Sequence, residues 1–212
     1  ISTADIGYQE ADFNKNPLKA NLRAIGNEIK KARKIAGEDK IIGVNIMVAL
    51  KDYAEIVKEC VRQKVDLIIS GAGIPKELPD YVKGSKTKIA PIVSSLRCCK
   101  LIVKHWIKKY NYVPDMIVIE GPEAGGHLGF KREELGEDTK PKLENITKEI
   151  VDYINEVKKE TGNDIPVIAA GGIWDSTDIK KFLDLGASGV QIATRFVATN
   201  ECDASIEFKK AY

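Results

Sequence analysis

Short apolar, β-branched runs alternate with longer amphipathic stretches along almost the whole chain. The runs that we predict to be strands span 1–4, 41–46, 66–70, 88–93, 115–119, 165–169 and 189–193. Stretches with apolar residues at three- and four-residue spacing predict helices over 17–35, 53–61, 96–110, 143–161 and 176–185. Strands that alternate with helices predict parallel βαβ units, and continuous apolar runs predict strands that are buried on both faces.

Two architectures are built from such units, and they predict different places for a site. An open, doubly wound sheet has one crevice, usually served by a Gly-rich turn after the first strand, but the turn after Ala4 lacks G-x-G-x-x-G. Distinctive residues instead follow several strands, which is typical of the TIM (β/α)8 barrel. A complete barrel takes eight strands and about 250 residues. Seven strands in 212 residues therefore predict one α/β barrel domain over 1–212 that lacks the first strand.

The charge balance and the cysteines exclude several classes of protein. The chain has 33 Lys and Arg against 31 Asp and Glu, so its net charge of +2 gives no drive toward nucleic acid or an anionic membrane. The longest nearly apolar run, 41–50, is too short to span a bilayer. The four cysteines show neither C-x-x-C spacing nor a histidine cluster. We therefore expect no metal site, no disulfide framework and a cytoplasmic location.

The segment 120–129 follows a predicted strand and surrounds His127 with four glycines. A structural turn needs one or two glycines, whereas a backbone that approaches a ligand closely uses more. Histidine is suited to proton transfer near neutral pH. We therefore predict a functional loop with His127 as its catalytic residue. The flanking Glu120 and Glu123 would bind a hydroxyl group, orient the histidine or simply be solvated.

Two further segments contain the ends of the last two predicted strands, where TIM barrels frequently bind a phosphate group. One contains Gly171 and Gly172, and the other runs from 186 to 195. Small residues expose backbone N–H groups to phosphate oxygens, so we predict phosphate binding there, with tight turns and close packing as the alternative. Trp174, just after the glycine pair, we interpret as a packing residue, with a cap over the site as the alternative. Asn45 interrupts an apolar strand, and the pattern leaves open whether it contacts a ligand or other core groups.

Five segments together carry a resemblance to a known family. They are G-V-N-I-M at 43–47, S-G-A-G-I-P at 70–75, E-G-P-E-A-G-G-H-L-G at 120–129, P-V-I-A-A-G-G-I at 166–173 and G-V-Q-I-A-T-R-F at 189–196. The chain resembles the nitronate monooxygenase (2-nitropropane dioxygenase) family and its close relative, the flavin-dependent enoyl-ACP reductase of the second type.

The resemblance implies a TIM barrel that holds FMN non-covalently, with His127 as the active-site histidine. The residues that it implies as FMN contacts are Asn45, Glu120, Gly125, Gly171, Gly172, Gln191, Ile192, Ala193 and Thr194. Ala193 departs from the family, which usually has glycine there, and its extra methyl group would crowd a phosphate oxygen. Family members also begin before this chain and continue past it, so the resemblance implies an incomplete barrel that lacks its first strand and a C-terminal segment.

The activity that the resemblance implies is the FMN-dependent oxidation of alkyl nitronates (nitroalkanes) with O2 to carbonyl compounds and nitrite. The alternative is the NADH- and FMN-dependent reduction of an enoyl thioester on acyl carrier protein. A third interpretation, a non-catalytic flavin- or phosphate-binding barrel, would have no need for His127. In the first two cases the partner is a small-molecule substrate, a nitronate or an enoyl thioester, and a homodimer is left open.

Overall fold

The computed structural model describes residues 1–127, 129–136 and 139–211. The chain forms two compact units. Unit 1 comprises Ile1–Val93 and Arg97–Ile117, and unit 2 comprises Ser94–Leu96 and the chain from Val118 onward. Each unit contains parallel strands and helices. The expectation of one domain over 1–212 stays a prediction.

The sheet of unit 1 has three parallel strands whose order follows the chain. They are β1 (Gly43–Met47), β2 (Leu67–Gly71) and β3 (Lys88–Val93). Val44 lies opposite Ile68, which lies opposite Ile89, and all three side chains are fully buried. Because alternate residues of a strand point to opposite faces, these side chains form one layer of the core.

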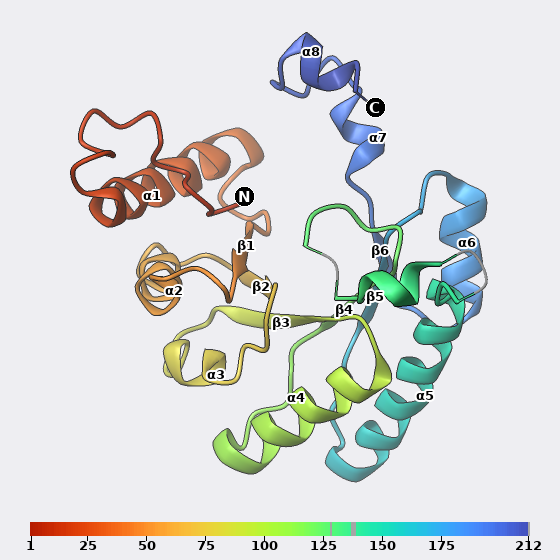
Figure 1. Ribbon diagram of the computed structural model, residues 1–212. Helices are drawn as coiled ribbons and strands as arrows, with labels where there is room; N and C mark the ends of the chain where they lie inside the picture. Colours follow the sequence, from red (N-terminus) through yellow and green to blue (C-terminus); the bar gives the residue numbers. More distant parts are fainter. Residues whose placement is uncertain (128, 137–138, 212) are drawn as a thin grey trace. The chain divides into compact units, whose positions relative to one another are not determined.

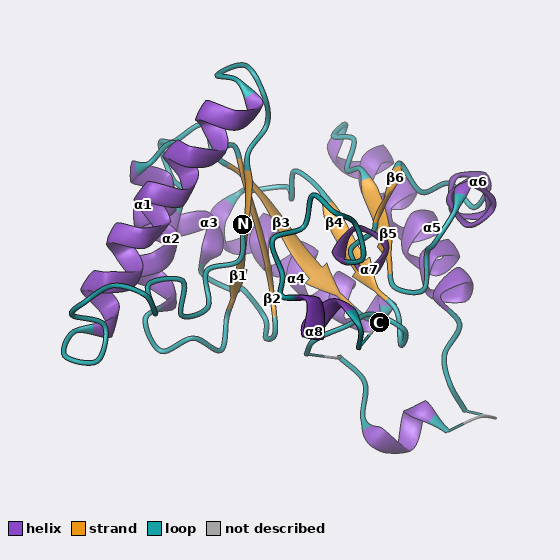
Figure 2. Ribbon diagram, turned by 90° about the horizontal axis from the view of Figure 1, so that it is seen from above, coloured by secondary structure: helices purple, strands orange, loops and turns teal. Residues whose placement is uncertain are grey.

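Four helices belong wholly or mainly to unit 1, namely α1 (Pro17–Ala36), α2 (Tyr53–Arg62), α3 (Leu78–Tyr81) and α4 (Leu96–Tyr110). Helix α1 begins with Pro at its first position after Asn16, and it ends at Gly37, whose φ is +105°. Figure 1 shows α1 and α2 on one side of β1 and β2, and the same arrangement is seen from above in Figure 2. The three longer helices confirm the predictions within a residue or two, whereas α3 was not predicted.

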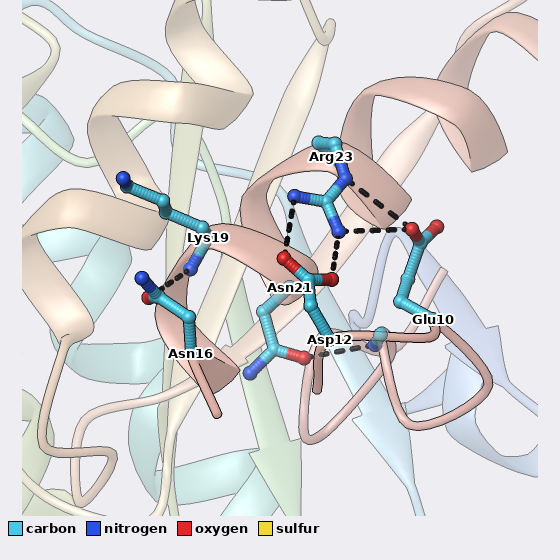
Figure 3. A network of polar contacts seen from close by, with 7 residues as sticks. Glu10, Asp12, Asn16, Lys19, Asn21 and Arg23 are labelled. Atoms are coloured by element: carbon cyan, nitrogen blue, oxygen red, sulfur yellow. Dashed lines mark hydrogen bonds and ion pairs between the residues drawn. The ribbon is translucent and has the colours of Figure 1, made fainter. Parts of the chain in front are cut away.

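The predicted strand over 1–4 is reduced to a single parallel bridge between Ser2 and Asn45, so this prediction is wrong. The chain turns at Asp5, whose φ is +47°, and residues 5–15 form successive turns instead of continuing along β1. Figure 3 shows how this segment is held on α1. Arg23 donates to the carboxylates of Glu10 and Asp12, and Asn21 Oδ1 accepts from the Gly7 N–H at 2.8 Å. Backbone pairing with β1 is therefore limited to residues 1–3, and polar contacts to α1 hold the chain that follows.

The strands of unit 2 are β4 (Ile117–Glu120), β5 (Val167–Ala170) and β6 (Gly189–Gln191). The first residue of β4, Ile117, is counted with unit 1. β5 and β6 are parallel, with Ala170 opposite Gln191. The N–H of Gly121, which directly follows β4, donates to the carbonyl of Ala170 at 2.9 Å. The carboxyl ends of the three strands therefore lie at the same edge of the sheet.

Five helical segments follow these strands, namely η1 (Arg132–Leu135), α5 (Leu143–Thr161), α6 (Ser176–Asp184), α7 (Thr194–Val197) and α8 (Ile206–Lys209). α5 and α6 lie on one side of β5 and β6, and α7 continues from β6 toward α8 (Figure 1). β6 is shorter than the predicted strand over 189–193, because Ala193 already forms the N-cap of α7. Among the described residues, no helix is both long and apolar enough to cross a membrane.

Candidate active site

A pocket of about 640 Å³ opens in unit 2 at the carboxyl ends of its three strands. Its volume lies within the range of small-molecule and cofactor sites, about 300–1,000 Å³. Its wall consists of the segments that follow β4, β5 and β6. The lining residues are Glu120, Glu123, Ala124, Gly125, Gly126, Ala170, Gly171, Gly172, Ile173, Trp174, Gln191, Ile192, Ala193, Thr194 and Val197.

The turn after β5 needs both of its glycines. Gly171 has φ +105° and Gly172 has φ +68°, a region that side chains other than glycine rarely adopt. A Cβ on Gly171 would lie 2.7 Å from the backbone nitrogen of Ala124, and one on Gly172 would collide with the carboxylate of Glu123. The tight turn and close packing that the sequence left as the alternative are therefore present, and the same two residues also line the pocket.

The loop after β4 contrasts with that turn. A Cβ on Gly125 or Gly126 would meet no atom within 4 Å, so packing explains neither glycine. Gly126 has φ +82°, a conformation that itself favours glycine, whereas Gly125 has no positive φ. Both glycines line the pocket. A glycine without a packing role, at the wall of a cavity, is typical of a backbone that a ligand approaches closely.

Two carboxylates line the pocket in different environments. Glu120, the last residue of β4, is half-buried, and this burial raises the pKa of its carboxyl group above the usual 4.5. Glu123 is exposed and forms an ion pair with Lys140 at 2.9 Å. The two carboxylates therefore differ in environment, since Glu120 is partly desolvated whereas Glu123 is exposed and ion-paired.

His127 is exposed and follows Gly126, the last lining residue of the loop, but its imidazole is not part of the pocket wall. Leu128, which belongs to the same predicted loop, lies outside the described residues. Asn45 belongs to unit 1, where its side chain is half-buried and its backbone N–H donates to the carbonyl of Ile1 at 2.7 Å. The catalytic role of His127 and the FMN contact of Asn45 stay predictions.

The structure thus brings eight of the ten predicted site residues into one wall. They are Glu120, Gly125, Gly171, Gly172, Gln191, Ile192, Ala193 and Thr194. Ile173 and Val197 also line the pocket, although no sequence pattern pointed to them. Their positions in the sequence could have indicated them, because each lies within six residues of a strand end that already carried a predicted contact.

Trp174 was interpreted as a packing residue, and this interpretation is wrong. The residue is 52% exposed and lines the pocket. Its indole therefore remains available to whatever the pocket binds.

Comparison with known proteins identifies the family to which this chain is similar. Residues 8–212 match the family model described as nitronate monooxygenase. A probable nitronate monooxygenase of Staphylococcus saprophyticus is 30% identical over 82% of this chain and 44% of its own length. A putative nitronate monooxygenase of Saccharomyces cerevisiae is 32% identical over 77% of this chain and 39% of its own length.

Among solved structures, FabK from Thermotoga maritima superposes with a TM-score of 0.71 at 28% identity, covering 89% of this chain and 52% of that chain. This likeness identifies the fold as the α/β TIM (β/α)8 barrel that the sequence predicts. The chain spans less than half the length of the two curated relatives and 52% of the FabK chain.

Proposed function

The chain belongs to the nitronate monooxygenase family, a family of flavoenzymes, and from this premise we propose that the whole protein is an FMN-dependent oxidoreductase. It oxidises alkyl nitronates with O2 to carbonyl compounds and nitrite. The observation that carries the proposal is the single pocket wall formed by the segments after β4, β5 and β6.

The lining residues fit a phosphorylated, planar ligand. Seven of the fifteen lining residues are glycine or alanine, so a ligand can reach their backbone N–H groups. No side chain caps the first turn of α7, whose first residue, Thr194, lines the pocket. Among the described lining residues there is no Lys or Arg. Backbone N–H groups and the Thr194 hydroxyl would therefore hold the phosphate of FMN, as small residues at strand ends do in other barrels.

Each group of residues then has a distinct role. When bound, FMN supplies the redox chemistry. Gly171, Gly172 and the segment 191–194 would bind its phosphate, and the half-buried Glu120 would offer its carboxyl group to the ligand from the pocket wall. A ring nitrogen of His127 would take the α-carbon proton of a neutral nitroalkane or hydrogen-bond a nitronate oxygen. General acid–base help of this kind contributes about 10²–10⁴-fold.

The superposition on FabK favours a second candidate, an NADH-dependent enoyl thioester reductase that also uses FMN. Both activities need the same cofactor pocket, so its wall does not distinguish them. The difference lies in what reduces the flavin, since a nitronate does so in one case and NADH in the other.

The test uses the full-length protein. A yellow preparation that releases FMN supports the cofactor, and a colourless one that binds no added FMN contradicts the proposal. The holoprotein is then mixed without oxygen with either a nitronate or NADH, and the flavin absorbance is followed. Bleaching by the nitronate alone supports the monooxygenase, and fast bleaching by NADH supports the reductase. Bound FMN that neither compound reduces supports the non-catalytic interpretation.

The cytoplasmic location and the homodimer stay proposals. The cytoplasmic location is supported by the spacing of the four cysteines, which predicts no disulfide framework. Size-exclusion chromatography with light scattering on the full-length protein tests the dimer, and a monomeric mass contradicts it.

A further inference from the structure

Trp174 is an unusual residue for a pocket rim, because its backbone is held while its large apolar side chain is left exposed. Both neighbouring elements fix it. Before it in the sequence, Gly171 and Gly172 form a turn with positive φ angles. After it, Asp175 caps α6 by accepting from the N–H groups of the first turn of that helix. The indole itself is 52% exposed and lines the pocket. Because Trp174 lines the pocket, its aromatic side chain can offer a flat apolar face to a bound ligand.

Two polar contacts hold the main chain of Trp174 directly. Its N–H donates to Asp178 Oδ2 at 2.9 Å, and its carbonyl accepts from Arg195 Nη1 at 2.7 Å. A hydrogen bond to a charged group is stronger than one between neutral groups. The position of Trp174 is therefore set from α6 and from α7 at the same time.

Arg195 makes a second contact with the same residue. Its guanidinium carbon lies 5.9 Å from the centre of the Trp174 ring, within the range of a cation–π interaction. The guanidinium thus contacts both the carbonyl and the ring of one residue. Arg195 is not among the lining residues, whereas Trp174 is.

We propose that Trp174 covers the flavin ring system in the pocket and that Arg195 is the positioning residue that holds the indole in place. This inference rests on the proposed function, because it takes FMN as the ligand. Arg195 then acts through Trp174 and makes no direct bond to the phosphate. An indole offers a flat, apolar face, and stacking on such a face is indifferent to the ligand's substituents.

The test measures the dissociation constants of FMN and riboflavin for the full-length protein by equilibrium dialysis. Riboflavin shares the ring system but lacks the phosphate. We expect Trp174→Ala to weaken both ligands about tenfold, which corresponds to about 1.4 kcal/mol, and Trp174→Phe to stay within about threefold because it keeps an aromatic face. The matched control is Phe196→Ala, which removes an exposed aromatic side chain of α7 that is not in the pocket wall.

A double-mutant cycle separates the two roles of Arg195. If Arg195 acts through Trp174, then Arg195→Met weakens FMN and riboflavin equally, and the double variant binds no more weakly than Trp174→Ala alone. Additive losses, or a loss confined to FMN, would mean that Arg195 binds the phosphate, and would overturn the positioning role. Lys180→Met, which removes another exposed cation of unit 2, controls for the change in charge.

A direct readout follows the indole itself. Oxidative labelling with mass spectrometry should show Trp174 protected by FMN in the unmodified protein, unprotected by inorganic phosphate, and less protected by FMN in Arg195→Met. Equal labelling of Trp174 with and without bound FMN contradicts the inference. If no flavin binds at all, the proposed function fails, whereas tight flavin binding by every variant overturns only the inference.

Discussion

The backbone of Gly171 approaches that of Ala124 so closely that a Cβ on residue 171 would lie 2.7 Å from the Ala124 nitrogen. The loop after β4 and the turn after β5 are therefore in contact through main-chain atoms. Glycine at this position does two things at once, since it permits φ +105° and leaves room for the neighbouring loop. The shape of the pocket wall depends on this contact.

Gly171→Ala should destabilise the protein by about 1–3 kcal/mol, because the strained backbone and the collision both oppose the native turn. Thermal unfolding of the full-length apoprotein measures the effect. The matched change Gly125→Ala adds a methyl group where no atom lies within 4 Å, so its stability should stay within about 0.5 kcal/mol. Gly125→Ala should instead weaken FMN binding, and normal binding by this variant would mean that no ligand approaches Gly125.

His127→Asn should lower the turnover of a neutral nitroalkane by about 10²–10⁴-fold, the usual contribution of general acid–base catalysis. His127 is exposed and outside the pocket wall, so neither the melting temperature nor FMN affinity should change. Steady-state kinetics with a neutral nitroalkane and with its preformed nitronate measure the effect. Unchanged turnover of both substrates would remove His127 from the mechanism.

Glu120→Gln should stabilise the protein at neutral pH more than at acidic pH. Burial raises the pKa of Glu120 in the folded state above its usual 4.5. The folded protein therefore binds the proton more tightly than the unfolded chain, and the stability this contributes is lost as the pH rises through the raised pKa. Glutamine stays neutral and avoids this loss.

Melting temperatures of the apoprotein across the range from pH 4 to neutrality measure the difference for Glu120→Gln. The gain over the unmodified protein should grow as the pH rises through the raised pKa. Glu123→Gln, which removes an exposed ion pair with Lys140, should change stability by about 0–1 kcal/mol. A pH-independent gain for Glu120→Gln would contradict the assigned cause.

Thr147→Val should leave stability unchanged or raise it by about 1 kcal/mol, since it removes a buried hydroxyl group at little change in shape. Thr147 on α5 is fully buried, and its Oγ1 has no hydrogen-bond partner among the described residues. Thr87→Val is the matched control, because the buried Thr87 Oγ1 donates to the carbonyl of Val65 at 2.8 Å. Denaturant unfolding should show a loss of stability for Thr87→Val only. An equal loss of stability in both variants would contradict the expectation that the Thr147 hydroxyl contributes nothing.

The long helices were predictable because their signals are local. Pro17 marks the start of α1, and Gly162 ends α5 with φ +73°, a conformation that glycine adopts without strain. Between such ends, the spacing of apolar residues defines the buried face. The short helices α3, α7 and α8 have four residues each, too few for a periodic pattern, and they were missed. The predicted strand over 1–4 pairs with β1 only through residues 1–3, because the chain turns away at Asp5, whose φ is +47°.

Some residues of the candidate site were likewise predictable from the sequence, and others were not. Glycines at strand ends and the segment 189–196 were visible as sequence patterns, since a backbone that must turn sharply or meet a ligand restricts the residue type. The exposure of Trp174 was not visible, because a tryptophan next to a turn suits packing and ligand contact equally well. Its orientation is set by Asp178 and by Arg195, which lies 21 residues further along the chain.

By itself, therefore, the amino-acid sequence determined the alternation of strands and helices, the fold class and the three segments that carry the site. Only the tertiary structure decided which side chains face the pocket, which carboxylate is desolvated and which residue holds Trp174. The physical reason is the separation along the sequence over which each interaction acts. Backbone propensity and apolar periodicity act between residues a few positions apart, whereas burial and ion pairing depend on residues that only folding brings together.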